Sequence, residues 1–367
     1  MLNPVISISH FQKKKRTMQK WQSAKNWLKA FTIRLFNWEY WPMWVVYLIP
    51  SFYFAWLSIK ARSFFFFTAA NPGIENGGMF FESKMKITEK LPSAYCPKTI
   101  LINATLNEEQ IRSQLKEAGL EFPLIAKPDR GERGWMVKKI HSFPELIAYQ
   151  SLFSHPFLVQ EYLDLPVELS IFYFRDPSKP NGIITSVTLK KLLSVTGNGR
   201  DTLQTLIMKF NRAFLQRKTL LNNNEINKNQ IISDGVEYLL VPYGNHCRGA
   251  AFFNFNHIID PQLEAVFDNI SKQVDGFFFG RYDLRTSSIE DLKNGKNIFI
   301  MELNGAGAEP AHIYQSGYPF LKALGDICRH YQMMYSAAKQ NRNKMKYMSY
   351  KEFRELRREE KAYKQSA

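Results

Sequence analysis

Two apolar stretches in the last third of the chain carry carboxylates. Asp283 lies in the Gly-Arg-Tyr-Asp-Leu-Arg segment at residues 280–285, and Glu302 and Asn304 lie within residues 298–305. A buried carboxylate is costly unless it is paired, so a positive group should face these two. Two carboxylates and an amide carbonyl form an all-oxygen set, which suits Mg²⁺ bound together with substrate phosphates. The sequence therefore predicts a site for Mg²⁺, with Mn²⁺ as an alternative, held by Asp283, Glu302 and Asn304.

A lysine followed by a glycine-containing turn lies at residues 122–137. Lys127 ends an apolar run, and Gly131 and Gly134 flank a loop that also contains Arg133. The lysine can meet a phosphate oxygen as a point charge, and the glycines let backbone N–H groups approach closely. The pattern predicts a cradle for nucleotide phosphates, although an ordinary surface turn fits this one motif about equally well.

A third stretch, Val-Gln-Glu-Tyr-Leu at residues 159–163, runs from an apolar strand into a connection. Such a hinge suits adenine, whose edge pairs with backbone groups near Gln160, Glu161 and Leu163. Glu168 follows Glu161 by seven residues and is placed to accept ribose hydroxyls. Each glutamate taken alone is more often an ordinary surface residue.

The elements that must position these residues form a mixed α/β pattern. Alternating and continuous apolar runs predict strands over residues 99–102, 122–127, 157–161, 169–175, 182–189, 277–284 and 298–303. Helical periodicity predicts helices over residues 108–118, 143–152, 202–214 and 261–274. Residues 71–78 are rich in turn formers and predict a domain boundary, and residues 218–230 predict a polar insertion or loop.

Length and composition set the class of protein. The chain has 367 residues, of which 45% are hydrophobic and 14% aromatic. These values exclude a disordered tail, a collagen-like fibre and a peptide toxin, and the length favours two or three packed lobes. The cysteines Cys96, Cys247 and Cys328 lack the spacing of a metal site or a disulfide framework, so a reducing compartment fits best.

The net charge is concentrated at the two ends of the chain. The 49 Lys and Arg against 33 Asp and Glu leave 49 − 33 = +16. Residues 1–36 carry eight basic residues and no acid, and residues 339–364 carry ten basic residues against four acids, or 10 − 4 = +6. The N-terminal segment also repeats apolar residues at helical spacing: Met18, Trp21, Leu28, Phe31 and Leu35. It predicts a basic amphipathic helix, which either packs its apolar stripe on the protein or binds an anionic membrane.

Residues 41–59 contain no charge and are rich in aromatic residues. The length can just span a bilayer, but Pro42 and Pro50 are expected to interrupt a helix, and the aromatic residues are spread along it. A single crossing would also export the rest of the chain, because the preceding cations stay in the cytoplasm. We expect a kinked re-entrant or interfacial segment, which places the protein peripherally or monotopically on the inner face of the membrane. No secretory signal is visible, and nucleic acid is not an expected partner.

Taken in their order along the chain, the three stretches resemble the ATP-grasp superfamily, most closely the carboxylate–amine ligase branch that includes D-alanine–D-alanine ligase. The resemblance covers about residues 83–317 and implies an α+β fold in which two lobes grip ATP between antiparallel sheets. Together with the charge and aromatic patterns outside it, the resemblance suggests four segments: a membrane-associated region at 1–78, a small lobe at 79–125, the ATP-grasp domain at 126–335 and a basic helical tail at 336–367.

The resemblance also implies roles for individual residues. Lys84, with Lys86 as the fallback, and Lys127 take the places of the two phosphate lysines. Glu161 and Glu168 match the hinge and ribose carboxylates, and Asp283, Glu302 and Asn304 match the metal ligands. Arg281 matches the arginine that steadies the transferred phosphoryl group.

The implied reaction is ADP-forming. A substrate carboxylate takes the γ-phosphoryl group of ATP, and an amine attacks the acyl phosphate. Arg281, with Arg285 or Arg248, would stabilise the acyl phosphate, and His246 would handle a proton or serve only the structure. Lys190 and Lys191 face either the triphosphate or solvent.

The sequence departs from these ligases in two places. Residues 129–134 contain Glu-Arg where the dipeptide ligases have small residues, and their serine-rich N-terminal lobe is absent. D-Alanine is therefore not expected as substrate, and the carboxylate and amine are either small molecules or lipid-linked. Two alternatives stay open: a phosphotransferase acting on a lipid or envelope precursor, and a non-catalytic membrane- or polyanion-binding protein.

Overall fold

The computed structural model describes residues 4–132, 134–223 and 226–365, and side chains from residue 20 onward. The chain divides into two compact units. Unit 1 contains the residues up to Tyr47 together with Leu192–Tyr243. Unit 2 contains Leu48–Lys191 and the residues from Gly244 on, and it holds every site residue expected from the sequence.

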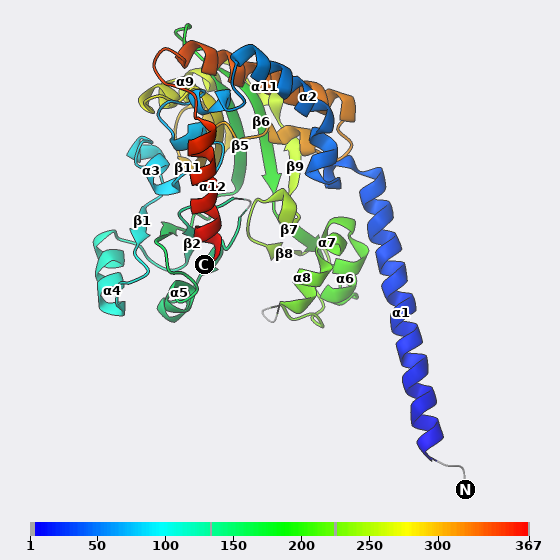
Figure 1. Cartoon of the computed structure of the whole chain (residues 1–367). Coiled ribbons are helices and arrows are strands. Elements are labelled where there is room, and N and C mark those ends of the chain that lie inside the picture. Colours follow the sequence, from blue (N-terminus) through cyan, green and yellow to red (C-terminus); the bar gives the residue numbers. More distant parts are fainter. Residues whose placement is uncertain (1–3, 133, 224–225, 366–367) are drawn as a thin grey trace. The chain divides into compact units, whose positions relative to one another are not determined.

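Unit 2 is built around a five-stranded antiparallel sheet in the order β11-β10-β5-β6-β9 (Figure 1). Its strands are β5 (Val167–Phe174), β6 (Ile183–Lys191), β9 (Ala251–Asn254), β10 (Phe279–Thr286) and β11 (Ile298–Asn304). The helices α9 (Pro261–Gln273) and α10 (Ile289–Lys293) accompany it. One face of the sheet packs against α9 in a core that includes Ile171, Tyr282 and Phe267. Antiparallel sheets combined with helices confirm the expected α+β class.

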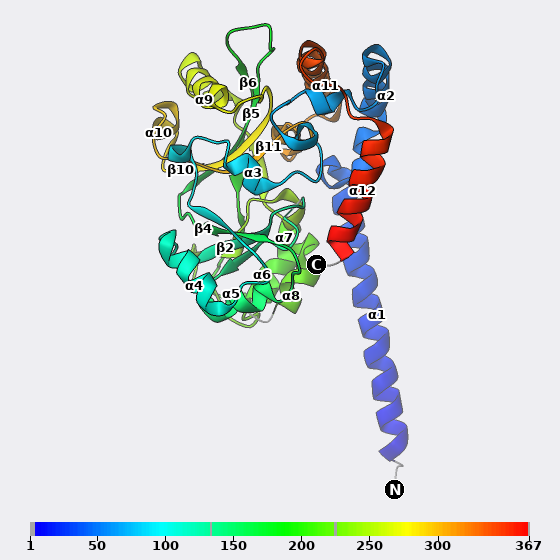
Figure 2. The same cartoon turned by 60° about the vertical axis from the view of Figure 1, so that its left-hand side comes forward.

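A second antiparallel sheet, in the order β1-β4-β2-β3, belongs to the same unit. Its strands are β1 (Thr99–Ile102), β2 (Leu124–Pro128), β3 (Lys138–Ile140) and β4 (Phe157–Glu161). The helices α4 (Glu108–Glu117) and α5 (Phe143–Gln150) contribute Ile111 and Leu146 to its core, and Figure 2 shows both beside the sheet. Lys127 lies near the end of β2, as the sequence predicts.

A third core in unit 2 joins helices from distant parts of the chain. It includes Leu57 of α2 (Met43–Ala61), Phe66 and Phe67 of a 3-10 turn, and Met334 of α11 (Phe320–Asn341). The short helix α3 (Lys84–Thr88) and the C-terminal helix α12 (Tyr350–Gln365) complete the unit. The helix α2 continues through Pro50, so the expectation that this proline interrupts it is wrong. Pro42 precedes α2, where a missing N–H group does no harm.

Unit 1 combines the long helix α1 (Pro4–Phe36) with the insertion at residues 192–243. The insertion contains α6 (Leu203–Lys209), α7 (Asn211–Leu215), α8 (Arg217–Asn222), β7 (Leu193–Thr196) and β8 (Glu237–Val241), with its own apolar core. Ala30 and Ile33 of α1 pack on Phe214. The buried pair of Arg212 and Glu39, at 2.8 Å, fastens the segment after α1 to the same insertion.

Three expectations about the chain's organisation differ from the structure. The helix expected over 202–214 is broken at Phe210, whose backbone is extended between α6 and α7. The polar region expected at 218–230 begins within α8, and residues 224–225 lie outside the described residues. The expected limit at residue 335 falls inside α11.

The turn-rich segment at residues 71–78 is not a linker. The Asn71 side chain is fully buried, accepts hydrogen bonds from the N–H groups of Phe278 and Phe279, and donates to the Gly77 carbonyl. Gly78 has φ of +74°, and a β-carbon there would lie 2.7 Å from the Gly305 backbone. The segment therefore packs into unit 2 beside the end of β11, because its turn residues are used for close backbone contact.

Candidate active site

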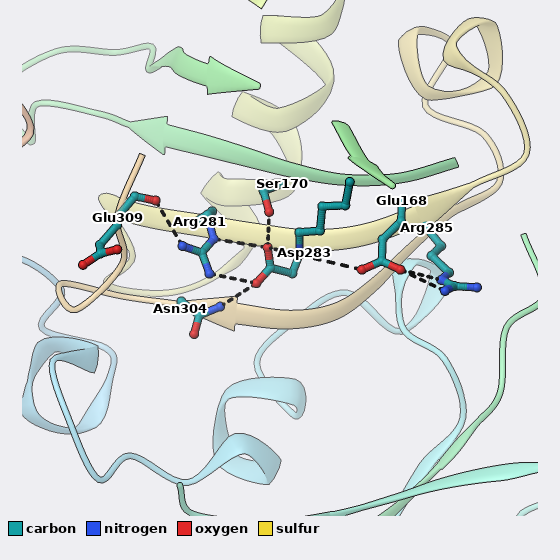
Figure 3. Close-up of polar contacts among 8 residues, drawn as sticks. Glu168, Ser170, Arg281, Asp283, Arg285, Asn304 and Glu309 are labelled. Atoms are coloured by element: carbon teal, nitrogen blue, oxygen red, sulfur yellow. Dashed lines mark hydrogen bonds and ion pairs between the residues drawn. The ribbon is translucent and has the colours of Figure 1, made fainter. Parts of the chain in front are cut away.

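Polar side chains form consecutive rows across the five-stranded sheet. The register aligns Thr188, Ser170, Asp283 and Glu302 on four neighbouring strands. Two residues further along the same strands, it aligns Lys190, Glu168 and Arg285. Because side chains alternate between the faces of a strand, both rows lie on the face opposite the α9 core. Figure 3 shows Ser170, Asp283, Glu168 and Arg285 together on this face.

Asp283 is the centre of the network. Its carboxylate accepts hydrogen bonds from Arg281 through both oxygens, at 3.1 and 3.0 Å, and from Lys190 at 3.0 Å. The Ser170 hydroxyl and the Asn304 amide also donate to it. The positive group expected to face this buried carboxylate is therefore a pair of cations.

The charges in this network shift the pKa of Asp283. Burial acts to raise the pKa, but the charges of Arg281 and Lys190 outweigh it and hold the pKa far below its ordinary value. Burial likewise acts to lower the pKa of Arg281, and Asp283 reverses that effect and raises it. Both groups are thus ionised at neutral pH. The other side of the Arg281 guanidinium donates to the Glu309 carbonyl at 3.0 Å, so Arg281 is fixed from both sides (Figure 3).

Glu168 and Arg285 form the second part of the network. Arg285 donates to Glu168 Oε2 at 2.8 and 3.2 Å and to the carbonyl of Leu163 at 2.7 Å. Lys190 lies 3.8 Å from the other Glu168 oxygen. Arg285 therefore ties Glu168 to the hinge segment, and its expected role at the acyl phosphate stays a prediction. A β-carbon on Gly244 would lie 1.8 Å from Glu168 Oε1, so a larger residue there would displace the Glu168 carboxylate.

Lys127 reaches from the four-stranded sheet to the five-stranded sheet. Its ammonium group is buried and donates to Gln160 Oε1 at 3.0 Å and to the Met301 carbonyl at 3.1 Å. The register of β10 with β11 skips Met301, and such a bulge leaves a backbone group available for another partner. Burial lowers the pKa of Lys127 to about 8, although the neighbouring Glu302 charge acts in the opposite direction.

The glycine loop is held against the segment that contains Lys84. Lys84 donates through its side chain to the Gly131 carbonyl, and its N–H donates to the Asp129 carbonyl at 3.0 Å. The Asp129 carboxylate accepts from the Ser83 hydroxyl and from the Met85 N–H. Lys86 instead forms an exposed ion pair with Glu75. The structure thus brings Lys84 rather than the fallback Lys86 to the loop. Arg133 lies outside the described residues.

The remaining expected residues border the loop and the hinge. Arg248 donates to the Gly134 carbonyl at 2.9 Å, so it lies against the glycine loop. His246 lies between the rings of Phe252 and Tyr314, each with a centroid distance of 5.3 Å. Glu161 accepts the Lys98 N–H at 3.3 Å, at the junction of β1 and β4.

The residues expected to bind a cation fit that role. Glu302 lies directly opposite Asp283 in the register, and its carboxylate contributes to the electrostatics of Lys127 and Arg281. Asn304 donates through its amide nitrogen to Asp283, so its amide oxygen is left as an acceptor. In the part of the chain that the structure describes, no three acidic, histidine or cysteine residues cluster as a complete metal site.

Two residues of the network were not identified from the sequence. Sequence patterns alone do not single out Ser170, and they are compatible with Lys190 facing either the triphosphate or solvent. The side chain of Lys190 is 7% exposed and bridges Asp283 and Glu168. The available signal was their period-two spacing with Glu168 and Thr188, which places them on one face of paired strands. Lys191, the next residue, is exposed.

Comparison with known proteins rests on structure. No protein-family model matches the chain, and no curated protein matches it in sequence. Its structure is similar to the VanG D-Ala:D-Ser ligase from Enterococcus faecalis, with 16% identity and a TM-score of 0.41 over 72% of this chain and 62% of that one. It is also similar to the D-alanine–D-alanine ligase from Bacillus anthracis, with 14% identity and a TM-score of 0.40 over 71% of this chain and 68% of that one.

A further similarity is to the bifunctional glutathione synthetase from Pasteurella multocida, with 14% identity and a TM-score of 0.37. It covers 66% of this chain but only 35% of the synthetase. The chain thus spans about a third of the synthetase and about three fifths of the D-Ala:D-Ser ligase. By their names, these three solved structures are two ligases and a synthetase.

Proposed function

We propose that this protein is an ATP-dependent, ADP-forming carboxylate–amine ligase. The observation that carries the proposal is the reach of Lys127 to the β11 bulge, beside the strand that contains Glu302 and Asn304. This contact joins a phosphate-binding lysine of one sheet to the carboxylate network of the other. A triphosphate held there would meet cations and oxygen ligands at the same time.

The nucleotide would lie along the residues already described. The ammonium groups of Lys84 and Lys127 offset phosphate charge, and the backbone around Gly131 approaches the phosphates. The hinge at residues 160–163 offers backbone groups to adenine. Glu168, held by Arg285, is oriented toward the ribose by the same hydrogen bonds that fix the hinge.

Asp283, Glu302 and Asn304 would hold Mg²⁺, which when bound neutralises phosphate charge and orients the phosphates. Arg281 carries the rest of the electrostatic stabilisation. Two contacts to Asp283 and one to the Glu309 carbonyl hold its guanidinium in place before substrate binds. Such preorganised donors stabilise developing negative charge more effectively than donors that must reorient.

The proposed reaction has two steps. A substrate carboxylate oxygen attacks the γ-phosphorus of ATP, the bond to the β–γ bridging oxygen breaks, and ADP leaves. The amine then attacks the acyl carbon, phosphate leaves with the C–O bond electrons, and the amine proton passes to solvent or a nearby base. His246 lies beside the glycine loop through its neighbour Arg248 and is the candidate for this base.

The test is to supply the purified protein with Mg²⁺, ATP and a panel of carboxylates and amines, and to measure ADP and phosphate. We expect release of both only when a carboxylate and an amine are present together. A stable phosphorylated product would instead support the phosphotransferase, and no turnover in any mixture would contradict an enzyme. Comparing lipids and metabolites of cells with wild-type protein and with Asp283→Asn then identifies the substrate.

We also propose that the protein binds the cytoplasmic face of an anionic membrane peripherally. In unit 1, α1 exposes Trp21, Trp27, Leu28, Phe31 and Leu35 alongside Lys20, Lys25 and Arg34. Met18 of the expected stripe lies outside the described side chains. The exposed apolar stripe supports membrane contact over packing on the protein, because a contiguous exposed apolar surface usually binds a membrane or a partner.

In unit 2, α2 exposes another apolar face. Leu48, Ile49, Phe52, Trp56 and Ile59 are exposed, while Leu57 and Ala61 on the opposite side pack in the core with α11. The helix is long and apolar enough to cross a bilayer, but its packed face favours an interfacial position. The double variant F52D/I59D tests this surface, and it should no longer sediment with phosphatidylglycerol vesicles. The control variant Leu152→Asp changes an exposed leucine after α5, and it should sediment like wild type. Unchanged sedimentation of F52D/I59D would contradict this docking surface.

A further inference from the structure

The C-terminal helix α12 is fastened at its beginning to the third core of unit 2. Ser349 and Glu352 form reciprocal hydrogen bonds between side chain and backbone, which is the capping box that starts a helix. One turn further, the ring of Phe353 packs 4.9 Å from Phe65 and 5.7 Å from Phe80. This end of α12 is therefore anchored by aromatic packing.

The other end of α12 reaches the glycine loop through Tyr363. Its ring stacks on His155, with centroids 4.4 Å apart and an interplanar angle of 15°, and meets Phe81 edge-on at 5.6 Å. Burial raises the pKa of the Tyr363 hydroxyl, and the neighbouring backbone N–H of Arg130 acts in the opposite direction. Tyr363 thus contacts Phe81, in the segment before Lys84, and lies beside Arg130, in the glycine loop.

Phe81 has a backbone conformation that needs such support. Its φ is +58°, a conformation that a bulky side chain adopts at a cost of about 1–3 kcal/mol unless its surroundings impose it. Arg130 donates to the Phe81 carbonyl and places its guanidinium 4.8 Å from the ring centroid. Tyr363 covers the same ring from another side. Arg130 and Tyr363 together hold Phe81 in this conformation.

These contacts lie next to the proposed phosphate site. Phe81 precedes Lys84 by three residues, and Arg130 lies between Asp129 and Gly131. Lys84 is bonded to the backbone of both Asp129 and Gly131. Any movement of Phe81 or Arg130 would therefore change the position of Lys84 and of the loop backbone.

We propose that α12 is a strap, and that Tyr363 is a positioning residue which holds the Lys84 segment and the glycine loop in the arrangement that binds ATP phosphates. This inference rests on the proposed function. It assigns to the basic C-terminal helix a role in nucleotide binding that lies outside the residues resembling the ATP-grasp ligases. Tyr363 does not touch the nucleotide; it acts through Phe81 and Arg130.

The test is Tyr363→Ala in the full chain, with binding of Mg²⁺–ATP and of adenosine measured by calorimetry. We expect the Kd for Mg²⁺–ATP to rise roughly tenfold, which corresponds to about 1.4 kcal/mol. The Kd for adenosine should stay unchanged, because adenosine reaches the hinge but not the loop. Tyr363→Phe keeps both ring contacts and loses only the hydroxyl, so it should bind Mg²⁺–ATP much more like wild type than Tyr363→Ala does.

Tyr350→Ala is the matched control, because Tyr350 lies at the start of the same helix and is 66% exposed. It should bind both ligands like wild type. Amide hydrogen exchange without nucleotide adds a second measurement: Tyr363→Ala should speed exchange around Lys84 and Gly131, and Tyr350→Ala should not. Wild-type exchange and wild-type ATP affinity in Tyr363→Ala would overturn the strap. If wild-type protein bound neither ATP nor adenosine, the proposed function would fail, and the exchange measurement would still decide whether Tyr363 holds the loop.

Discussion

The two faces of β5 and β10 differ in chemistry around Asp283, although the residues of the two faces alternate in the sequence. One face presents Ile171, Tyr282 and Leu284 to the apolar core beneath α9. The other presents Ser170, Asp283 and Arg285 to a network of ion pairs. Each strand therefore contributes to an apolar core with one face and to a charged network with the other.

The difference shows where stability and chemistry reside. Burying apolar area contributes roughly 25 cal/mol per Å², so the α9 face accounts for much of the fold's stability. Ion pairs removed from water gain little net stability, because desolvation offsets most of their attraction. We therefore expect substitutions on the polar face to change ligand binding more than stability, and substitutions on the apolar face to do the reverse.

The largest effect is expected for Asp283→Asn on the polar face. The amide keeps the shape of the carboxylate but removes the charge that orients Arg281 and Lys190, so ADP formation should fall on the order of 100- to 1000-fold. Initial-rate assays with the identified substrates measure this. Asp234→Asn, at an exposed aspartate of unit 1, should retain wild-type rates. Equal rates of ADP formation in wild type and Asp283→Asn would contradict a catalytic role of the polar face.

Next in size is Ile171→Ala on the apolar face. It should lower the free energy of unfolding by about 2–5 kcal/mol, because it leaves a cavity in the fully buried core. The folded fraction should keep its affinity for Mg²⁺–ATP. Chemical denaturation and calorimetry measure the two quantities separately. Ile183→Ala is the matched control, since Ile183 is 41% exposed at the start of β6 and should change stability by less than about 0.5 kcal/mol. A large loss of ATP affinity in Ile171→Ala would contradict the prediction that the apolar face affects stability and not nucleotide binding.

A smaller effect is expected from titrating Lys127. Its pKa of about 8 lies below the ordinary value of 10.5, so the ammonium loses its proton as pH rises through about 8. Affinity for Mg²⁺–ATP should then weaken by at most about tenfold per pH unit. The contribution of this group to stability has the opposite sign: between about pH 8 and 10.5 the unfolded chain holds the proton more tightly, so the free energy of unfolding rises.

Binding isotherms between pH 7 and 9.5 check the Lys127 prediction. The step near pH 8 should be absent in Lys127→Met, whose affinity should be low throughout. A step of the same size in both proteins would assign the titration to another group.

The smallest effect is expected for Lys86→Ala. Lys86 is 60% exposed in its pair with Glu75, and such surface pairs contribute less than about 1 kcal/mol. ATP affinity should stay close to wild type, whereas Lys84→Ala should weaken it clearly because Lys84 holds the Gly131 carbonyl. Calorimetry on the two single variants compares them directly. A larger loss of ATP affinity in Lys86→Ala than in Lys84→Ala would indicate that Lys86, and not Lys84, binds the phosphates.

Much of the strand pattern was predictable because it depends on local periodicity. The strands over 99–102 and 157–161 have the expected bounds, and β10 and β11 lie within two residues of theirs. The carboxylates of β10 and β11 stood out because they interrupt apolar runs. Local signals were less reliable at Pro50 and at residues 71–78, where packing against distant segments overrode the helix-breaking and turn-forming tendencies.

By itself, the sequence determined which residues alternate between an apolar and a polar face, because that depends only on the two-residue period of a strand. Tertiary structure alone decided their partners. Strand pairing brings Lys190 to Asp283 across 93 residues, and a bulge turns the Met301 carbonyl toward Lys127 across 174 residues. Such contacts follow from register and burial, which are set by the packing of whole sheets and are not encoded in any local stretch of the chain.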